Sequence, residues 1–183
     1  MSHSLLRSSL VTTMVLVGSS VFAQNTTTTT ATYDNWTMRC STRAEADKKM
    51  KTCQIDSTAF VKLQSGQTTP VLGMTLQRLD PAQPMKFHVN VQLMSLIQNG
   101  VKILGAEDKE ILQLKYDLCR TDMCETSAEV QDAQIQELKK LNDKAFILYK
   151  AFGQQGAQDV RVEVSMKGFS AAYDAMLKEM PKK

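Results

Sequence analysis

The amino-acid sequence predicts a mainly β protein: an antiparallel β-sandwich with one or two short helices, cross-linked by disulfides. Roughly eight segments alternate apolar and polar residues at regular spacing, as strands do when they bury one face and expose the other. Turn-forming residues such as Asn99-Gly100 separate these segments. Four cysteines, an even number, follow a leader that predicts export. These three observations together favour two stacked antiparallel sheets over a parallel α/β sheet.

Residues 1–23 are typical of a secretory signal peptide. Arg7 supplies positive charge, an apolar stretch runs from Leu10 to Val17, and small residues precede a cleavage point between Ala23 and Gln24. An uncleaved membrane anchor is the alternative, but the apolar stretch is shorter than the roughly 20 residues that a spanning helix needs. No later segment is apolar enough to span a bilayer, and the first cysteine, Cys40, is too far from the cleavage point to carry a lipid anchor. We therefore expect a soluble exported product.

The mature chain divides into a short arm and one domain. Residues 24–32 are rich in threonine and lack apolar periodicity, so we expect a flexible N-terminal arm there. Residues 33–180 then form a single β-sandwich domain, since the roughly 160 residues that remain after removal of residues 1–23 are an ordinary number for one core.

Eight segments carry the strand pattern, most clearly the one from Met85 to Leu93. There Met85, Phe87 and Val89 face one side while Lys86 and His88 face the other. The eight predicted strands are Tyr33–Cys40, Thr52–Leu63, Val71–Leu79, Met85–Leu93, Val101–Leu104, Leu112–Cys119, Ala145–Phe152 and Val160–Met166.

Two segments follow helical spacing instead. Asp132–Asn142 places apolar residues three apart, which predicts a short helix over one end of the sheets. Gly168–Met180 carries a longer apolar face that includes Phe169 and Tyr173 and ends before Pro181. We interpret this face as packing surface. Trp36, on an alternating strand near a cysteine, is interpreted as a core aromatic, and the 11 methionines as core filler.

The four cysteines predict two disulfides in an oxidising compartment. Their positions favour the local pairs Cys40 with Cys53 and Cys119 with Cys124, although four cysteines allow three pairings. Redox catalysis is the alternative use of paired cysteines. It normally shows a Cys-x-x-Cys spacing, whereas Cys119 and Cys124 are separated by four residues.

No residue pattern in the chain predicts catalysis, a metal or another cofactor. His88 is the only histidine after the leader, and its place on the polar side of a strand indicates a solvated surface residue. One histidine and four oxidised cysteines do not make a usual metal site. Phosphate-binding loops and nucleophile elbows are absent from the sequence. A formal net charge of +3 is too small to suggest nucleic acid as a partner. We expect a non-enzymatic protein.

Taken in order, several segments resemble the invasion-associated locus B family of alphaproteobacterial envelope proteins. Tyr33-Asp34-Asn35-Trp36-Thr37-Met38-Arg39-Cys40 is similar to the family's opening strand, and Cys53 follows as the second cysteine. Val89–Ile103 resembles its central strand, turn and Gly-Val strand, and Leu114–Cys124 its strand ending in paired cysteines, with Met123 where glycine is common. Val164–Ala172 resembles the C-terminal motif around Gly168-Phe169, with Met166 in place of leucine.

The resemblance implies an immunoglobulin-like sandwich in the periplasm or at the outer membrane. It also implies a role in association with or invasion of host cells such as erythrocytes, with a host-cell surface or envelope protein as partner. Only the cysteines carry over as site residues, and their role is structural. A periplasmic accessory protein for envelope integrity or assembly, with indirect effects on invasion, is the alternative. The ligand, binding face and oligomeric state stay open.

Overall fold

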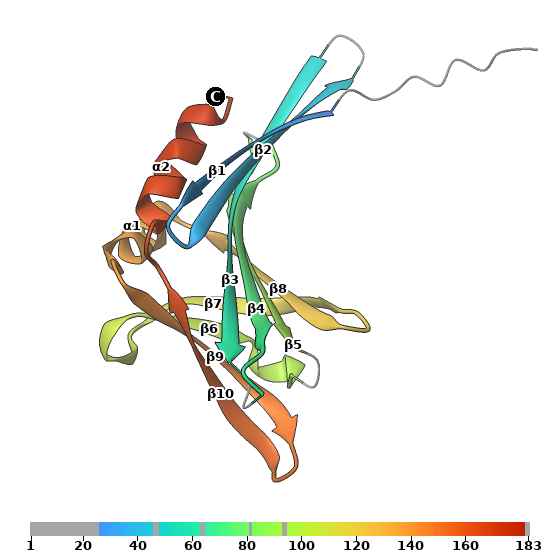
Figure 1. The fold of residues 1–183 in the computed structure, drawn as a ribbon, viewed down its shortest axis with the longest axis vertical. Helices are drawn as coiled ribbons and strands as arrows, with labels where there is room; N and C mark the ends of the chain where they lie inside the picture. Colours follow the sequence, from blue (N-terminus) through green and yellow to red (C-terminus); the bar gives the residue numbers. More distant parts are fainter. Residues whose placement is uncertain (1–25, 46–47, 63–64, 81, 93–94, 182–183) are drawn as a thin grey trace, which may run out of the picture.

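The fold is mainly antiparallel β. The computed structural model describes residues 26–45, 48–62, 65–80, 82–92 and 95–181. These residues form ten strands, two α-helices and two single 3-10 turns (Figure 1). The strands are β1 (Thr26–Tyr33), β2 (Trp36–Glu45), β3 (Lys48–Lys62), β4 (Thr68–Arg78), β5 (Met85–Gln92), β6 (Val101–Leu104), β7 (Glu110–Cys119), β8 (Met123–Val130), β9 (Lys144–Gly153) and β10 (Gly156–Ser165). The helices are α1 (Asp132–Lys140) and α2 (Phe169–Glu179).

The strands follow one hydrogen-bonded order, β1-β2-β3-β4-β5-β8-β7-β6-β9-β10, and each neighbouring pair is antiparallel. β7 joins the two layers of the sandwich. Its first half pairs with β6 and its second half with β8, with an irregularity between Tyr116 and Leu118. A strand that changes sheets at such a bulge makes the corner between two packed layers. The predicted antiparallel sandwich is therefore confirmed, with two strands more than predicted.

The core lies between the layers and is filled by the alternating residues that the sequence singled out. In β5, Met85, Phe87, Val89 and Val91 are all buried, while Lys86 is exposed. The interpretation of methionine as core filler is also confirmed for six buried side chains: Met38, Met74, Met85, Met166, Met176 and Met180. An unbranched thioether suits the irregular space between twisted sheets.

Helix α2 closes the layer formed by β1, β2 and β3 (Figure 1). Phe169 packs edge-on against Trp36, with ring centroids 5.0 Å apart, and stacks on Tyr173. All three rings are buried, so they are packing residues as the sequence indicated. The turn into α2 needs glycine, because Gly168 has φ +86° and a Cβ there would collide with the carbonyl of Tyr33.

The structure places both helices close to the ranges that the sequence predicted. In α1, predicted as Asp132–Asn142, Ile135 and Leu138 are buried, and Gln131 with Gln134 forms a capping box at the N-terminus. α2 lies within the predicted Gly168–Met180. No helix in the part of the chain that the structure describes is long and apolar enough to cross a membrane.

The prediction of a flexible arm over residues 24–32 is wrong from Thr26 onward. Thr26–Tyr33 forms β1 and pairs along its whole length with β2. As an edge strand exposed on both faces over most of its length, it needs no alternation of apolar residues, and threonine favours extended structure. The predicted signal peptide, with Ala23 and Gln24, lies outside the described residues.

Strand β8 was missed for another reason. Its inward positions include Cys124 and Thr126, which are too small or too polar to show an apolar alternation. Thr126 is fully buried, and its hydroxyl donates to the carbonyl of Val89 at 2.8 Å. Because that bond satisfies the hydroxyl, the core accepts a polar residue there.

Candidate functional site

The four cysteines form two disulfides, Cys40–Cys53 and Cys119–Cys124, which is the local pairing that their spacing favoured. Cys40 and Cys53 lie directly opposite each other on β2 and β3 and are buried in the core. Cys119 and Cys124 face each other across the β7–β8 hairpin, where Cys124 is buried and Cys119 is exposed. Both bonds hold neighbouring strands together, and the described cysteines include no free thiol.

His88 lies at the centre of the outer, polar face of the sheet. It is half-buried instead of solvated, and its ring contacts the side-chain amide of Gln77 at 3.0 Å. Burial lowers its pKa, nearby Lys86 lowers it further, and Asp117 and Glu125 oppose the shift. The histidine therefore favours its neutral form. Among the described residues, no cluster of three His, Cys, Asp or Glu side chains is suited to hold a metal ion.

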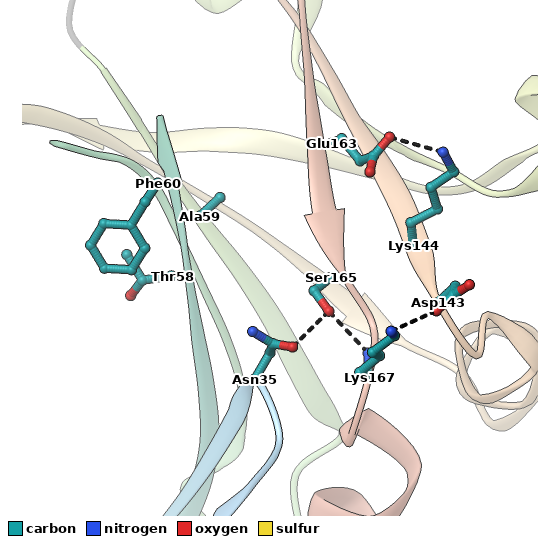
Figure 2. Close-up of a pocket in the computed structure, with 9 residues that line it drawn as sticks. All are labelled: Asn35, Thr58, Ala59, Phe60, Asp143, Lys144, Glu163, Ser165 and Lys167. Atoms are coloured by element: carbon teal, nitrogen blue, oxygen red, sulfur yellow. Dashed lines mark hydrogen bonds and ion pairs between the residues drawn. The ribbon is translucent and has the colours of Figure 1, made fainter. Parts of the chain in front are cut away.

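A groove of about 640 Å³ lies between β3 and β10 (Figure 2). Thr58, Ala59 and Phe60 line one wall, and Glu163 and Ser165 line the other. β3 and β10 come near each other but do not pair as neighbouring strands. The groove is thus a gap between two sheet edges that belong to different layers. We call it the β3–β10 groove.

A short hydrogen-bond network closes one end of the β3–β10 groove. The backbone N–H of Asn35 donates to the carbonyl of Lys167, and the Trp36 indole N–H donates to the carbonyl of Ser165, each at 3.2 Å. The Ser165 hydroxyl donates to the side-chain oxygen of Asn35 at 2.9 Å (Figure 2). These bonds fix the end of β10 against the turn that begins β2.

The charges around the groove neutralise each other. Lys144 pairs with Glu163 at 3.0 Å, and Lys167 lies 3.4 Å from Asp143. Phe60, by contrast, leaves 59% of its surface exposed at the opposite wall. The lining of the groove therefore offers paired charges and one exposed aromatic ring.

The sequence did not single out the β3–β10 groove, because its walls come from strands far apart in the chain. Phe60, Asn35 and Ser165 each lay within a predicted strand and looked like ordinary strand residues. The one available signal was Gly168-Phe169, since the turn there places the end of β10 beside Asn35.

Comparison with known proteins agrees with the fold. The family model described as "Invasion associated locus B (IalB) protein" matches residues 36–177. A crystal structure of invasion associated protein B from Bartonella henselae superposes with a TM-score of 0.66 at 16% sequence identity, covering 82% of this chain and 95% of that one. A comparison with curated protein sequences returned no match.

Proposed function

Because the chain belongs to the invasion-associated locus B family, we propose that it is an exported, non-enzymatic envelope protein that promotes association with or invasion of host cells by binding. The family match over residues 36–177 is the observation that carries this proposal. Two features support it: the pattern of residues 1–23 is that of an export signal, and a disulfide cross-linked fold suits an oxidising compartment. The proposed location is the periplasm or the outer membrane.

Deletion of the gene tests the proposal directly. The expected result is a loss of adhesion to and invasion of host cells that a plasmid copy restores. A matched control is a plasmid copy with His88→Gln, which removes the only histidine in the described chain and should restore invasion as well as the wild type. Unchanged adhesion and invasion in the deletion strain would refute a role in host-cell association.

The side of the outer membrane on which the protein lies separates direct binding from an indirect role. Protease digestion of intact cells, with a known periplasmic protein as control, measures this. Digestion in intact cells would support contact with the host. Protection until the outer membrane is opened, together with detergent sensitivity of the mutant, would replace the proposal by a periplasmic accessory role in envelope integrity.

A further inference from the structure

Strand β3 extends beyond its neighbour β2 and leaves part of one edge open. β2 begins at Trp36, and its pairing with β3 begins at Thr37 opposite Asp56. β3 continues to Lys62, and on its other side it stays paired with β4. Within the described part of the chain, no strand pairs with residues 57–62 on the side that β2 leaves. This open edge forms one wall of the β3–β10 groove.

The direction of the backbone N–H and C=O groups along this edge follows from the Cys40–Cys53 pair, which lies earlier on β3. The Cα atoms of Cys40 and Cys53 are 4.1 Å apart, which is the spacing of a pair without mutual hydrogen bonds. The pairing of β3 with β4 shifts register between Ala59 and Phe60, but the extra residue, Val71, lies on β4. Because the direction therefore continues to alternate along β3, Thr58 and Phe60 point their N–H and C=O groups away from β4. Pro70, which has no N–H, lies opposite Phe60 on β4 and agrees with this assignment.

The edge of β10 faces the same space. The Ser165 carbonyl points away from β9, because it accepts the Trp36 indole N–H. By the same alternation, Glu163 also points its backbone groups away from β9. Two open strand edges therefore face each other across the groove, and the bonds at Asn35 close its end.

We infer that the β3–β10 groove binds an extended, uncharged segment of a partner protein, which adds as a strand to the open edge of β3. The segment continues the position of β2 and runs antiparallel to Thr58–Lys62, as all neighbours in this sheet do. In such strand addition, backbone hydrogen bonds between the two strands give affinity, and every second side chain of the added segment gives specificity.

Charge identifies the class of segment. The two lysines and two carboxylates that line the groove are paired with each other, Lys144 with Glu163 and Lys167 with Asp143, so a charged segment would find no unpaired counter-charge in this lining. Phe60 and Val61 remain 59% and 40% exposed at the open edge and offer contacts to β-branched or aromatic side chains. About five residues fit along the edge, at ~3.3 Å per residue. The inference rests on the proposed function only in taking the partner to be a protein.

A phage-displayed library of random dodecapeptides, selected on the purified mature protein, is the probe. Enriched peptides should be uncharged and rich in β-branched and aromatic residues. Thr58→Pro removes an edge N–H that β4 does not use, and its ring occupies the place of an added strand. Peptide affinity, measured by fluorescence anisotropy, should fall at least tenfold.

The matched control is Thr30→Pro on β1. Arg39 directs its backbone groups toward β3, so Thr30, opposite Arg39, directs its own away from β2. Thr30→Pro therefore alters an equally open edge far along the sheet and should leave affinity unchanged. Circular dichroism and melting of both variants establish that they fold. Phe60→Ser leaves the backbone intact and should weaken peptide binding several-fold. It replaces Thr58→Pro as the test variant if that protein does not fold.

Amide hydrogen exchange locates the bound peptide. Binding should slow exchange at Thr58 and Phe60 and leave Thr30 unchanged. Equal affinity of the Thr58 and Thr30 variants, absence of enriched peptides, or protection elsewhere would overturn the inference. So would concentration-dependent dimerisation that Thr58→Pro abolishes, because the occupant would then be a second copy of this chain. A groove variant that loses peptide binding yet supports full invasion leaves the proposed function standing and refutes only the groove as its site.

Discussion

The two disulfides lie in regions of different character. The Trp36 region comprises Trp36, the α2 residues Phe169 and Tyr173, and the Cys40–Cys53 bond, all of them buried. The β7–β8 hairpin comprises Cys119–Cys124 and the turn between them, where Cys119 is exposed and Arg120 pairs with Glu125 at 3.0 Å. The first region joins a helix and three strands, whereas the second connects two neighbours that are already hydrogen-bonded.

This difference predicts that the two disulfides contribute unequally to the free energy of unfolding. A disulfide stabilises mainly by restricting the unfolded chain, more so for a longer loop. The Cys40–Cys53 loop spans 13 residues, and the bond lies within the packed core. Cys119–Cys124 spans 5 residues and fixes a hairpin at the corner where β7 changes sheets. We therefore expect the free energy of unfolding to depend chiefly on the Trp36 region.

Phe169→Ala should have the largest effect, a loss of about 3–5 kcal/mol in the free energy of unfolding. The substitution removes a buried ring that contacts both Trp36 and Tyr173, and it leaves a cavity at the foot of α2. Urea denaturation followed by Trp36 fluorescence measures the loss. Trp36 is the only tryptophan and reports the same region.

Leu118→Ala is the matched change in the β7–β8 hairpin. Leu118 is 50% exposed, so its loss should change stability by no more than about 0.5 kcal/mol. A comparable loss at both sites would contradict the division into a stabilising core region and a local hairpin.

Replacing both members of a disulfide by alanine should give the next largest effect. For Cys40 with Cys53 we expect a loss of about 3 kcal/mol, and for Cys119 with Cys124 about 2 kcal/mol at most, from loop length alone. Thermal and urea unfolding of the two double variants, without reductant, provides the comparison. A larger loss for the Cys119–Cys124 variant would show that the sheet corner, and not the core, limits stability.

Much of the Trp36 region could be predicted from the sequence, since its signals are local. Alternation identified β2, helical spacing identified α2, and cysteine spacing favoured the Cys40–Cys53 pair. β1 and β8 escaped because neither has an apolar alternation: β1 is an exposed edge strand, and β8 buries small or polar residues. Apolar periodicity detects only strands that bury large side chains on one face.

The β3–β10 groove could not be predicted for a different reason. Its walls depend on which strands lie at the edges of the sheet order, and on where β2 ends relative to β3. Alternation specifies which face of a strand is buried but contains no information on its neighbours. Asn35 and Ser165, which meet at the closed end, are 130 residues apart.

The pH dependence at His88 should be the smallest effect, and carboxylates of β7 and β8 act on it electrostatically. Burial lowers the pKa of His88 below its usual 6.5, so the native state binds the proton less well than the unfolded chain. Stability should therefore be fully present above pH 6.5 and fall as the pH drops below that value. Comparing the midpoints of urea unfolding at pH 7.5 and pH 5.5 measures this loss.

Two substitutions test whether the pH dependence of stability comes from His88. His88→Gln should remove the part of the pH dependence due to this ring while keeping a partner for Gln77. Asp117, from the β7–β8 side, opposes the shift, so Asp117→Asn should lower the pKa of His88 further, as observed by NMR titration of the ring. If Asp117→Asn left that pKa unchanged, Asp117 would exert no electrostatic influence on His88, and Glu125 would be the carboxylate left to oppose the shift.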